Sequence, residues 1–65
     1  MELTLGKRIS MYRKAKNMTQ EDLAQKLGVT SQAVSKWETD SACPDISLLP
    51  RLASLLGVSV DALLS

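Results

Sequence analysis

The chain of 65 residues has no histidine and a single cysteine, Cys43. One thiol cannot form a disulfide within the chain, and without histidine or a second thiol there are too few ligands for a zinc or haem site. We therefore expect no metal and no cofactor, and a reducing, cytoplasmic setting. The Asp and Glu residues of the chain are scattered, and no nucleophile can be paired with a general base, so we also expect no enzymatic activity.

Long apolar runs are absent as well. The longest contain two or three residues, whereas about 20 are needed to cross a bilayer, so we expect neither a membrane span nor an export signal. Phenylalanine is missing, and one tryptophan and one tyrosine are the only aromatic residues, which favours short helices over a β-sandwich. With no internal repeat or linker, we expect one all-α domain over residues 1–65.

The net charge is only +1, but it is unevenly distributed. Residues 1–36 carry seven Lys or Arg and three acids, a balance of +4, while residues 37–65 carry one Arg and four acids, a balance of −3. One end is therefore basic. If the partner is a polyanion, the small net charge predicts weaker and less salt-sensitive binding than a strongly basic domain would show.

Apolar residues recur at helical spacing at the start of the chain. Leu5, Ile9 and Tyr12 predict a helix over about residues 4–16. Asn17 is expected to end it. Lys and Arg residues surround this stripe. They are either simply solvated or face phosphate groups, and the sequence favours neither alternative.

Two eight-residue helices are expected next. Thr19 and Asp22 have the spacing of a capping box, which starts a second helix that Gly28 ends in a left-handed conformation. Thr30 is the N-cap candidate for a third helix over residues 31–38. The expected buried residues of these helices are Leu23, Ala24, Leu27, Val34 and Trp37.

The remaining chain predicts a loop and two further helices. Pro44 lies in a segment of turn composition. A fourth helix should begin between residues 45 and 47, because Pro50 is tolerated only in a first turn. Gly57 closes this helix and Ser59 caps a short fifth one. The expected apolar residues are Leu48, Leu52, Leu55, Leu56, Val60, Leu63 and Leu64, of which Leu63 and Leu64, together with Leu49, serve either the core or a dimer face.

The helix expected over residues 31–38 has an unusual outer side. Successive helical residues lie about 100° apart, so Val34 and Trp37 face one way and a polar set faces the other. The polar set is Ser31, Gln32, Ser35 and Lys36. In an isolated helix such a set is an ordinary solvated face. Here two short helices are joined by a three-residue turn with the small Ala24 at the crossing, which is typical of a helix-turn-helix over residues 20–38.

A family resemblance rests on spaced positions across almost the whole chain. They are Gln20, Leu23-Ala24, Leu27-Gly28-Val29, Val34, Trp37-Glu38 and the tail LASLLGVSVDALL. The chain resembles the lambdoid phage repressor and Cro family, also called the XRE family. The resemblance implies a lambda-repressor-like bundle of five short helices that binds double-stranded DNA sequence-specifically as a transcriptional regulator, with helix 31–38 in the major groove.

The resemblance also implies roles for individual residues. Ser31, Gln32, Ser35 and Lys36 would meet base edges, with Gln32 suited to adenine and Lys36 to guanine. The implied phosphate contacts are Gln20, Thr30 and Thr39. The implied structural positions are Ala24, Gly28, Val34, Trp37, Arg13 and Glu38, of which the last two would form an ion bridge between the first and third helices.

Some questions stay open at this point. The sequence departs from the family after Glu38, where Asp40 is expected to repel a nearby phosphate and weaken contacts from the loop. We expect a homodimer on a palindromic operator, because such operators need two recognition helices roughly 34 Å apart. The alternative is the same fold used as a protein-interaction module, in an adaptor or an antitoxin. A small-molecule effector, the operator sequence and the direction of regulation are not specified by these residues.

Overall fold

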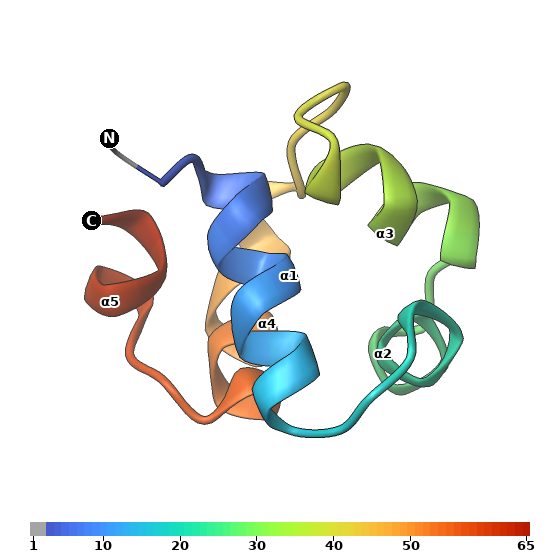
Figure 1. Cartoon of the computed structure of the whole chain (residues 1–65), viewed down its shortest axis with the longest axis horizontal. Helices are drawn as coiled ribbons and strands as arrows, with labels where there is room; N and C mark the ends of the chain where they lie inside the picture. Colours follow the sequence, from blue (N-terminus) through green and yellow to red (C-terminus); the bar gives the residue numbers. More distant parts are fainter. Residues whose placement is uncertain (1–2) are drawn as a thin grey trace.

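The computed structural model describes residues 3–65 and contains five α-helices joined by short turns (Figure 1). The elements are α1 (Leu5–Ala15), α2 (Gln20–Leu27), α3 (Ser31–Glu38), the 3₁₀ turn η1 (Ile46–Leu48), α4 (Leu49–Leu56) and α5 (Val60–Leu64). The all-α fold with five short helices that the sequence predicts is confirmed. Within residues 3–65 no helix has the length and apolar character to cross a membrane.

Side chains at the N-caps set where most helices begin. The cap hydroxyl accepts a hydrogen bond from the amide three residues further on in α1, α2, α3 and α5, which satisfies an amide that has no partner inside the helix. These caps are Thr4, Thr19, Thr30 and Ser59. In the predicted capping box the Thr19 amide donates to Asp22 Oδ2 at 2.9 Å, and the Asp22 amide donates to Thr19 Oγ1 at 3.0 Å.

Residues with a left-handed backbone conformation mark the ends of three helices. Gly28 has φ 77° and Gly57 has φ 74°. Glycine adopts these positive φ values readily because it has no Cβ that would clash with the backbone. Asn17, with φ 58°, follows α1 in the same region. All three were predicted as helix ends from their residue type, and these predictions are confirmed.

The fourth helix starts differently from the prediction. A helical turn does begin at Ile46, but it is the 3₁₀ turn η1, and α4 begins at Leu49. An α-helix running from Ile46 would place the ring of Pro50 against the Ile46 carbonyl four residues earlier and remove that hydrogen bond. The prediction of an α-helix starting at residues 45–47 was therefore wrong, whereas Pro50 does lie in the first turn of α4.

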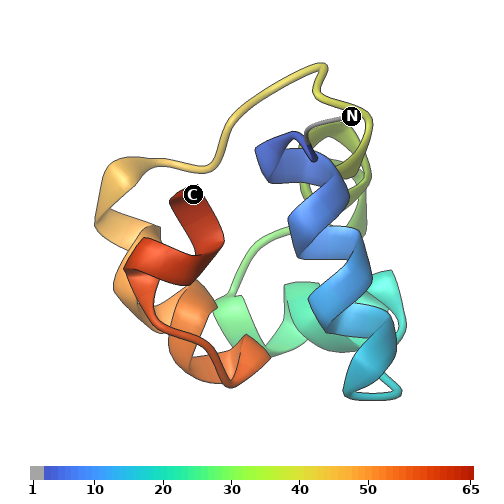
Figure 2. The ribbon, with the colours of Figure 1, turned by 60° about the vertical axis from the view of Figure 1, so that its left-hand side comes forward.

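The five helices bury one apolar cluster. Helix α3 packs against α1 and α2, and α4 contacts α1, α2 and α5 (Figures 1 and 2). The buried side chains are Ile9, Leu23, Ala24, Leu27, Val34, Trp37, Leu49, Leu52, Ala53, Leu56 and Leu63. Of the three leucines left open between the core and a dimer face, Leu49 and Leu63 belong to this core, while Leu64 is 52% exposed.

A close approach between α1 and the end of α3 depends on Gly6. A Cβ at this position would collide with the Trp37 carbonyl oxygen and lie 2.6 Å from Asp40 Oδ1. The Gly6 amide instead donates to Asp40 Oδ1 at 3.1 Å, and Thr4 Oγ1 donates to Asp40 Oδ2 at 2.7 Å. Asp40 thus caps α1 from the loop after α3, a role that the sequence did not indicate.

The substitution Gly6→Ala tests this packing. In a free helix alanine is favoured over glycine by about 1 kcal/mol, but the added methyl here overpacks a backbone contact, which costs about 1–3 kcal/mol. We expect Gly6→Ala to lower the urea midpoint. Lys14→Ala, at an exposed position of the same helix, is the control and should change it little. A midpoint for Gly6→Ala equal to or above that of the native chain would contradict the close approach.

Candidate nucleic-acid interface

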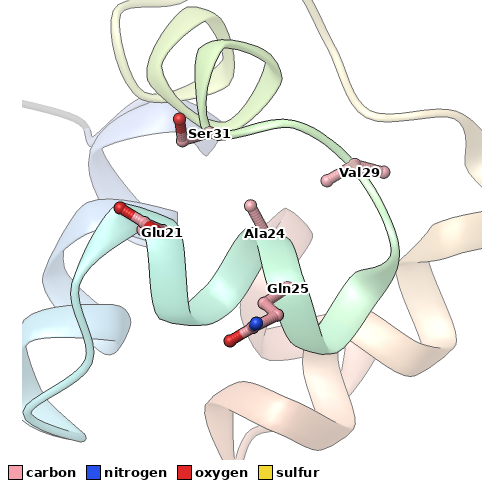
Figure 3. Close-up of a pocket in the computed structure, with 5 residues that line it drawn as sticks. All are labelled: Glu21, Ala24, Gln25, Val29 and Ser31. Atoms are coloured by element: carbon pink, nitrogen blue, oxygen red, sulfur yellow. The ribbon is translucent and has the colours of Figure 1, made fainter.

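A short turn holds α2 and α3 at an angle. The Gly28 and Val29 amides donate to the carbonyls of Gln25 and Ala24, at 3.3 and 3.0 Å, which completes the end of α2. The side chain of Ala24 is 2% exposed and faces the turn (Figure 3). Because this residue is small, α3 can cross close to α2, so residues 20–38 form a helix-turn-helix.

Helix α3 separates an apolar side from a polar side. Val34 and Trp37 are buried, with 0% and 6% exposed, whereas Gln32 and Lys36 are exposed and Ser31 and Ser35 are half-buried. The Ser31 hydroxyl is 3.5 Å from Gln32 Oε1. The four residues named as base readers therefore lie outside the core on a single helix, and we call them the polar face of α3.

A pocket of about 330 Å³ opens between α2 and the start of α3 (Figure 3). It is lined by Glu21, Ala24, Gln25, Val29 and Ser31. Ser31, from the polar face, forms one wall, and the acidic Glu21 of the first turn of α2 lies across from it. The pocket is thus a continuation of the surface on which the polar face lies.

A buried ion pair connects α1 with the last residue of α3. Arg13 Nε donates to Glu38 Oε2 at 2.7 Å and Arg13 Nη2 donates to Glu38 Oε1 at 3.0 Å, while Arg13 Nη1 donates to the Met18 carbonyl at 2.8 Å. The side chains of Arg13 and Glu38 are only 10% and 7% exposed. The ion bridge that the resemblance implies is therefore present, and it is bidentate.

Gln20 belongs to the same network. Its Nε2 donates to Glu38 Oε1 at 3.0 Å, so one carboxylate oxygen accepts from both Gln20 and Arg13. This bond was not expected from the sequence, in which Gln20 was named only for a phosphate contact. Gln20 and Glu38 are 18 positions apart in the sequence, so no local pattern signals this bond.

The network shifts the pKa of both charged groups. Burial acts most strongly on Glu38 and raises the pKa of its carboxyl, but the hydrogen bonds from Arg13 and Gln20 and the charge of Arg13 together outweigh it, so the pKa lies below its ordinary value. The hydrogen bond with Glu38 raises the pKa of Arg13 against the opposing effect of burial. Both groups therefore remain charged at neutral pH.

The two threonines named for phosphate contact use their hydroxyls locally. Thr30 Oγ1 accepts from the Ala33 amide at 3.2 Å as the N-cap of α3. Thr39 Oγ1, at the other end of α3, lies 3.2 Å from the carbonyls of both Ser35 and Lys36, to which it donates. Both residues are exposed and flank the polar face. Cys43, in the loop beyond, is free and exposed.

Acid should weaken the fold through Glu38. Because its pKa is lower in the folded than in the unfolded chain, Glu38 contributes stability that is complete above the ordinary glutamate pKa of about 4.3 and is lost as the pH falls through the folded value. We expect the free energy of unfolding, measured with urea between pH 7 and pH 3, to fall toward acid. Asp22, whose pKa is lowered by the Thr19 amide, acts in the same direction.

The substitution Glu38→Gln distinguishes the contribution of the Glu38 carboxyl to the acid dependence of stability from that of the Asp22 carboxyl. It leaves Arg13 buried without its counter-charge, which costs about 3–5 kcal/mol at neutral pH, and it should flatten the acid dependence. Asp22→Asn is the control because it removes the other shifted carboxyl and leaves the ion pair. If Glu38→Gln retained the full acid dependence of the native chain, the buried pair would not be its source.

Sequence comparison identifies relatives along most of the chain. A family model described as helix-turn-helix matches residues 9–63. The SPbeta prophage-derived uncharacterized HTH-type transcriptional regulator YonR of Bacillus subtilis is 41% identical over 59 residues, which cover 91% of this chain and 55% of YonR. The chain spans about half or less of the first curated relatives that it matches.

Solved structures of similar shape include DNA complexes. The P22 c2 repressor, crystallised with a synthetic operator, superposes with a TM-score of 0.92 at 33% identity, over 98% of this chain and 97% of that one. SinR, a master regulator for biofilm formation crystallised with DNA, gives a TM-score of 0.86 at 36% identity, over 95% of this chain and 100% of that one. Both likenesses extend over nearly the whole chain.

Proposed function

Because the chain belongs to the helix-turn-helix family of lambdoid phage repressors and XRE regulators, we propose that it binds double-stranded DNA sequence-specifically as part of a transcriptional regulator. The observation that carries the proposal is the polar face of α3, which lies outside the core on the second helix of the helix-turn-helix. A major groove about 12 Å wide accepts one α-helix presented in this way.

The polar face supplies groups that suit base edges. Gln32 can accept from and donate to adenine N6 and N7, and Lys36 can donate to guanine O6 and N7, each pairing being worth about 1–3 kcal/mol of discrimination. Ser31 and Ser35 have hydroxyls that both donate and accept, so they read bases with less selectivity. We assign base reading to these four residues.

Phosphates would be bound around the polar face. Gln20 lies in the first turn of α2, where unpaired amides and the helix dipole favour an anion. Thr30 and Thr39 lie at the two ends of α3. Thr30 Oγ1 accepts from the Ala33 amide, so its own proton can still donate to a phosphate, whereas the Thr39 proton is used by the carbonyls of Ser35 and Lys36. Of the two hydroxyls, that of Thr30 is therefore the better phosphate donor.

Further parts of the proposal concern the assembly and the setting. We infer that residues 1–65 act as one DNA-binding domain with residues 20–38 as its core, and that two copies bind a palindromic operator, because two half-sites need two recognition helices. A DNA-binding role is compatible with a cytoplasmic location and with the absence of catalysis by this chain. The likeness of the chain to transcriptional regulators along most of its length supports these inferences.

Selection of binding sites from random duplexes tests the proposal. We expect the native chain to enrich a motif, Gln32→Ala to lose preference at one base position, and Lys36→Ala to lose it at another. The expected loss of discrimination is about 5- to 150-fold at each position. Failure of the native chain to enrich any motif would contradict sequence-specific binding.

A charge-matched control separates base reading from general attraction. Lys26→Ala removes the same charge from an exposed position on α2 and should leave the enriched motif unchanged while weakening binding slightly. If Gln32→Ala and Lys36→Ala also kept the native motif, base reading would have to be assigned to other residues.

Salt dependence distinguishes DNA binding from use as a protein-interaction module. The logarithm of the association constant for the selected duplex should fall linearly with the logarithm of salt concentration between about 50 and 200 mM, because cations are released from the DNA. An apolar protein contact would not show this fall. Binding that stays constant over this range would favour the alternative of an adaptor or antitoxin module.

A further inference from the structure

Glu38 connects the ion pair to the first turn of α2. Its Oε1 accepts from Arg13 Nη2 and from Gln20 Nε2, each at 3.0 Å, and its Oε2 accepts from Arg13 Nε at 2.7 Å. Because Arg13 holds both carboxylate oxygens in a fork, the carboxylate cannot rotate freely. The position of Glu38 Oε1, and with it the acceptor for Gln20, is therefore fixed by α1.

This geometry decides which end of the Gln20 amide faces Glu38. A carboxylate attracts the NH₂ end of a side-chain amide and repels its carbonyl oxygen. Nε2 carries two protons, of which Glu38 takes one. The second proton is not used by Glu38, and the backbone amides of Gln20 and Glu21, as first-turn amides of α2, have no partner inside the helix. Three donors thus gather at the start of α2.

We propose that Arg13 and Glu38 are positioning residues that fix the Gln20 amide with its second Nε2 proton available to a DNA phosphate. The proposal rests on the proposed function, since it concerns the same interface. It adds that binding of a phosphate depends on two residues that are nearly buried. Gln20 itself is half-buried, so it has both an inward and an outward side.

The first experiment uses the free chain and needs no DNA. NMR spectra of the native protein should show slow exchange with water for the Gln20 Nε2 proton that is bound to Glu38, whereas the second Gln20 proton and both side-chain NH₂ protons of Gln25 should exchange as in an exposed side chain. Gln25 is the matched control because it lies exposed in the same helix. Equal exchange for Gln20 and Gln25 would overturn the proposal, whatever the chain binds.

The second experiment measures coupling on the selected duplex. In the native background Gln20→Ala should weaken binding about tenfold, as expected for one hydrogen bond to a charged group, and equally for selected and unrelated duplexes, since phosphates carry no sequence information. In the background Arg13→Met/Glu38→Leu, which replaces the pair by apolar side chains of similar size, Gln20→Ala should weaken binding less than about twofold. Circular dichroism verifies that each variant is folded.

The outcomes separate this proposal from the function on which it rests. If Gln20→Ala weakened binding by the same factor in both backgrounds, Glu38 would not position Gln20, and DNA binding would stand. If Gln20→Ala had no effect in the native background, the phosphate contact would be refuted. If the native chain bound no duplex, the proposed function would fail, and this proposal with it.

Discussion

The buried ion pair between Arg13 and Glu38 holds the helix-turn-helix against the rest of the chain. Helix α1 has 11 residues and α2 and α3 have eight each, while an isolated helix is only marginally stable below about 12–15 residues. Their stability must therefore come from contacts between helices. The pair links α1 to the end of α3, and the bond from Arg13 to the Met18 carbonyl fixes the turn before α2. Three helices thus share one anchor.

Local features of the fold could be predicted from the sequence because they depend on residues a few positions apart. The Thr19–Asp22 capping box, the left-handed Gly28 and the buried side of α3 all follow from residue type and helical spacing. The polar face of α3 was predicted in the same way, as the opposite side of the helix from Val34 and Trp37. The same reasoning failed at the start of α4, where the ring of Pro50 favours a 3₁₀ turn.

Long-range contacts could not be predicted in this way. The Gly6–Asp40 hydrogen bond joins residues 34 positions apart, and nothing in the local sequence pairs them. The repulsion of phosphate by Asp40 stays a prediction, but the hydrogen bonds that its carboxylate accepts from the start of α1 were not predicted. The resemblance did point to Arg13 with Glu38, but not to Gln20 as a third partner.

The polar face of α3 has a consequence for how such a protein can diversify. The caps of α3, Thr30 and Thr39, and its buried residues Val34 and Trp37 are all distinct from the polar face. Exchanging Gln32 or Lys36 therefore removes no core contact and no helix cap. Substitutions at these positions should change the stability of the fold little. Duplicated copies of one such domain can therefore evolve toward different targets while they keep the same fold.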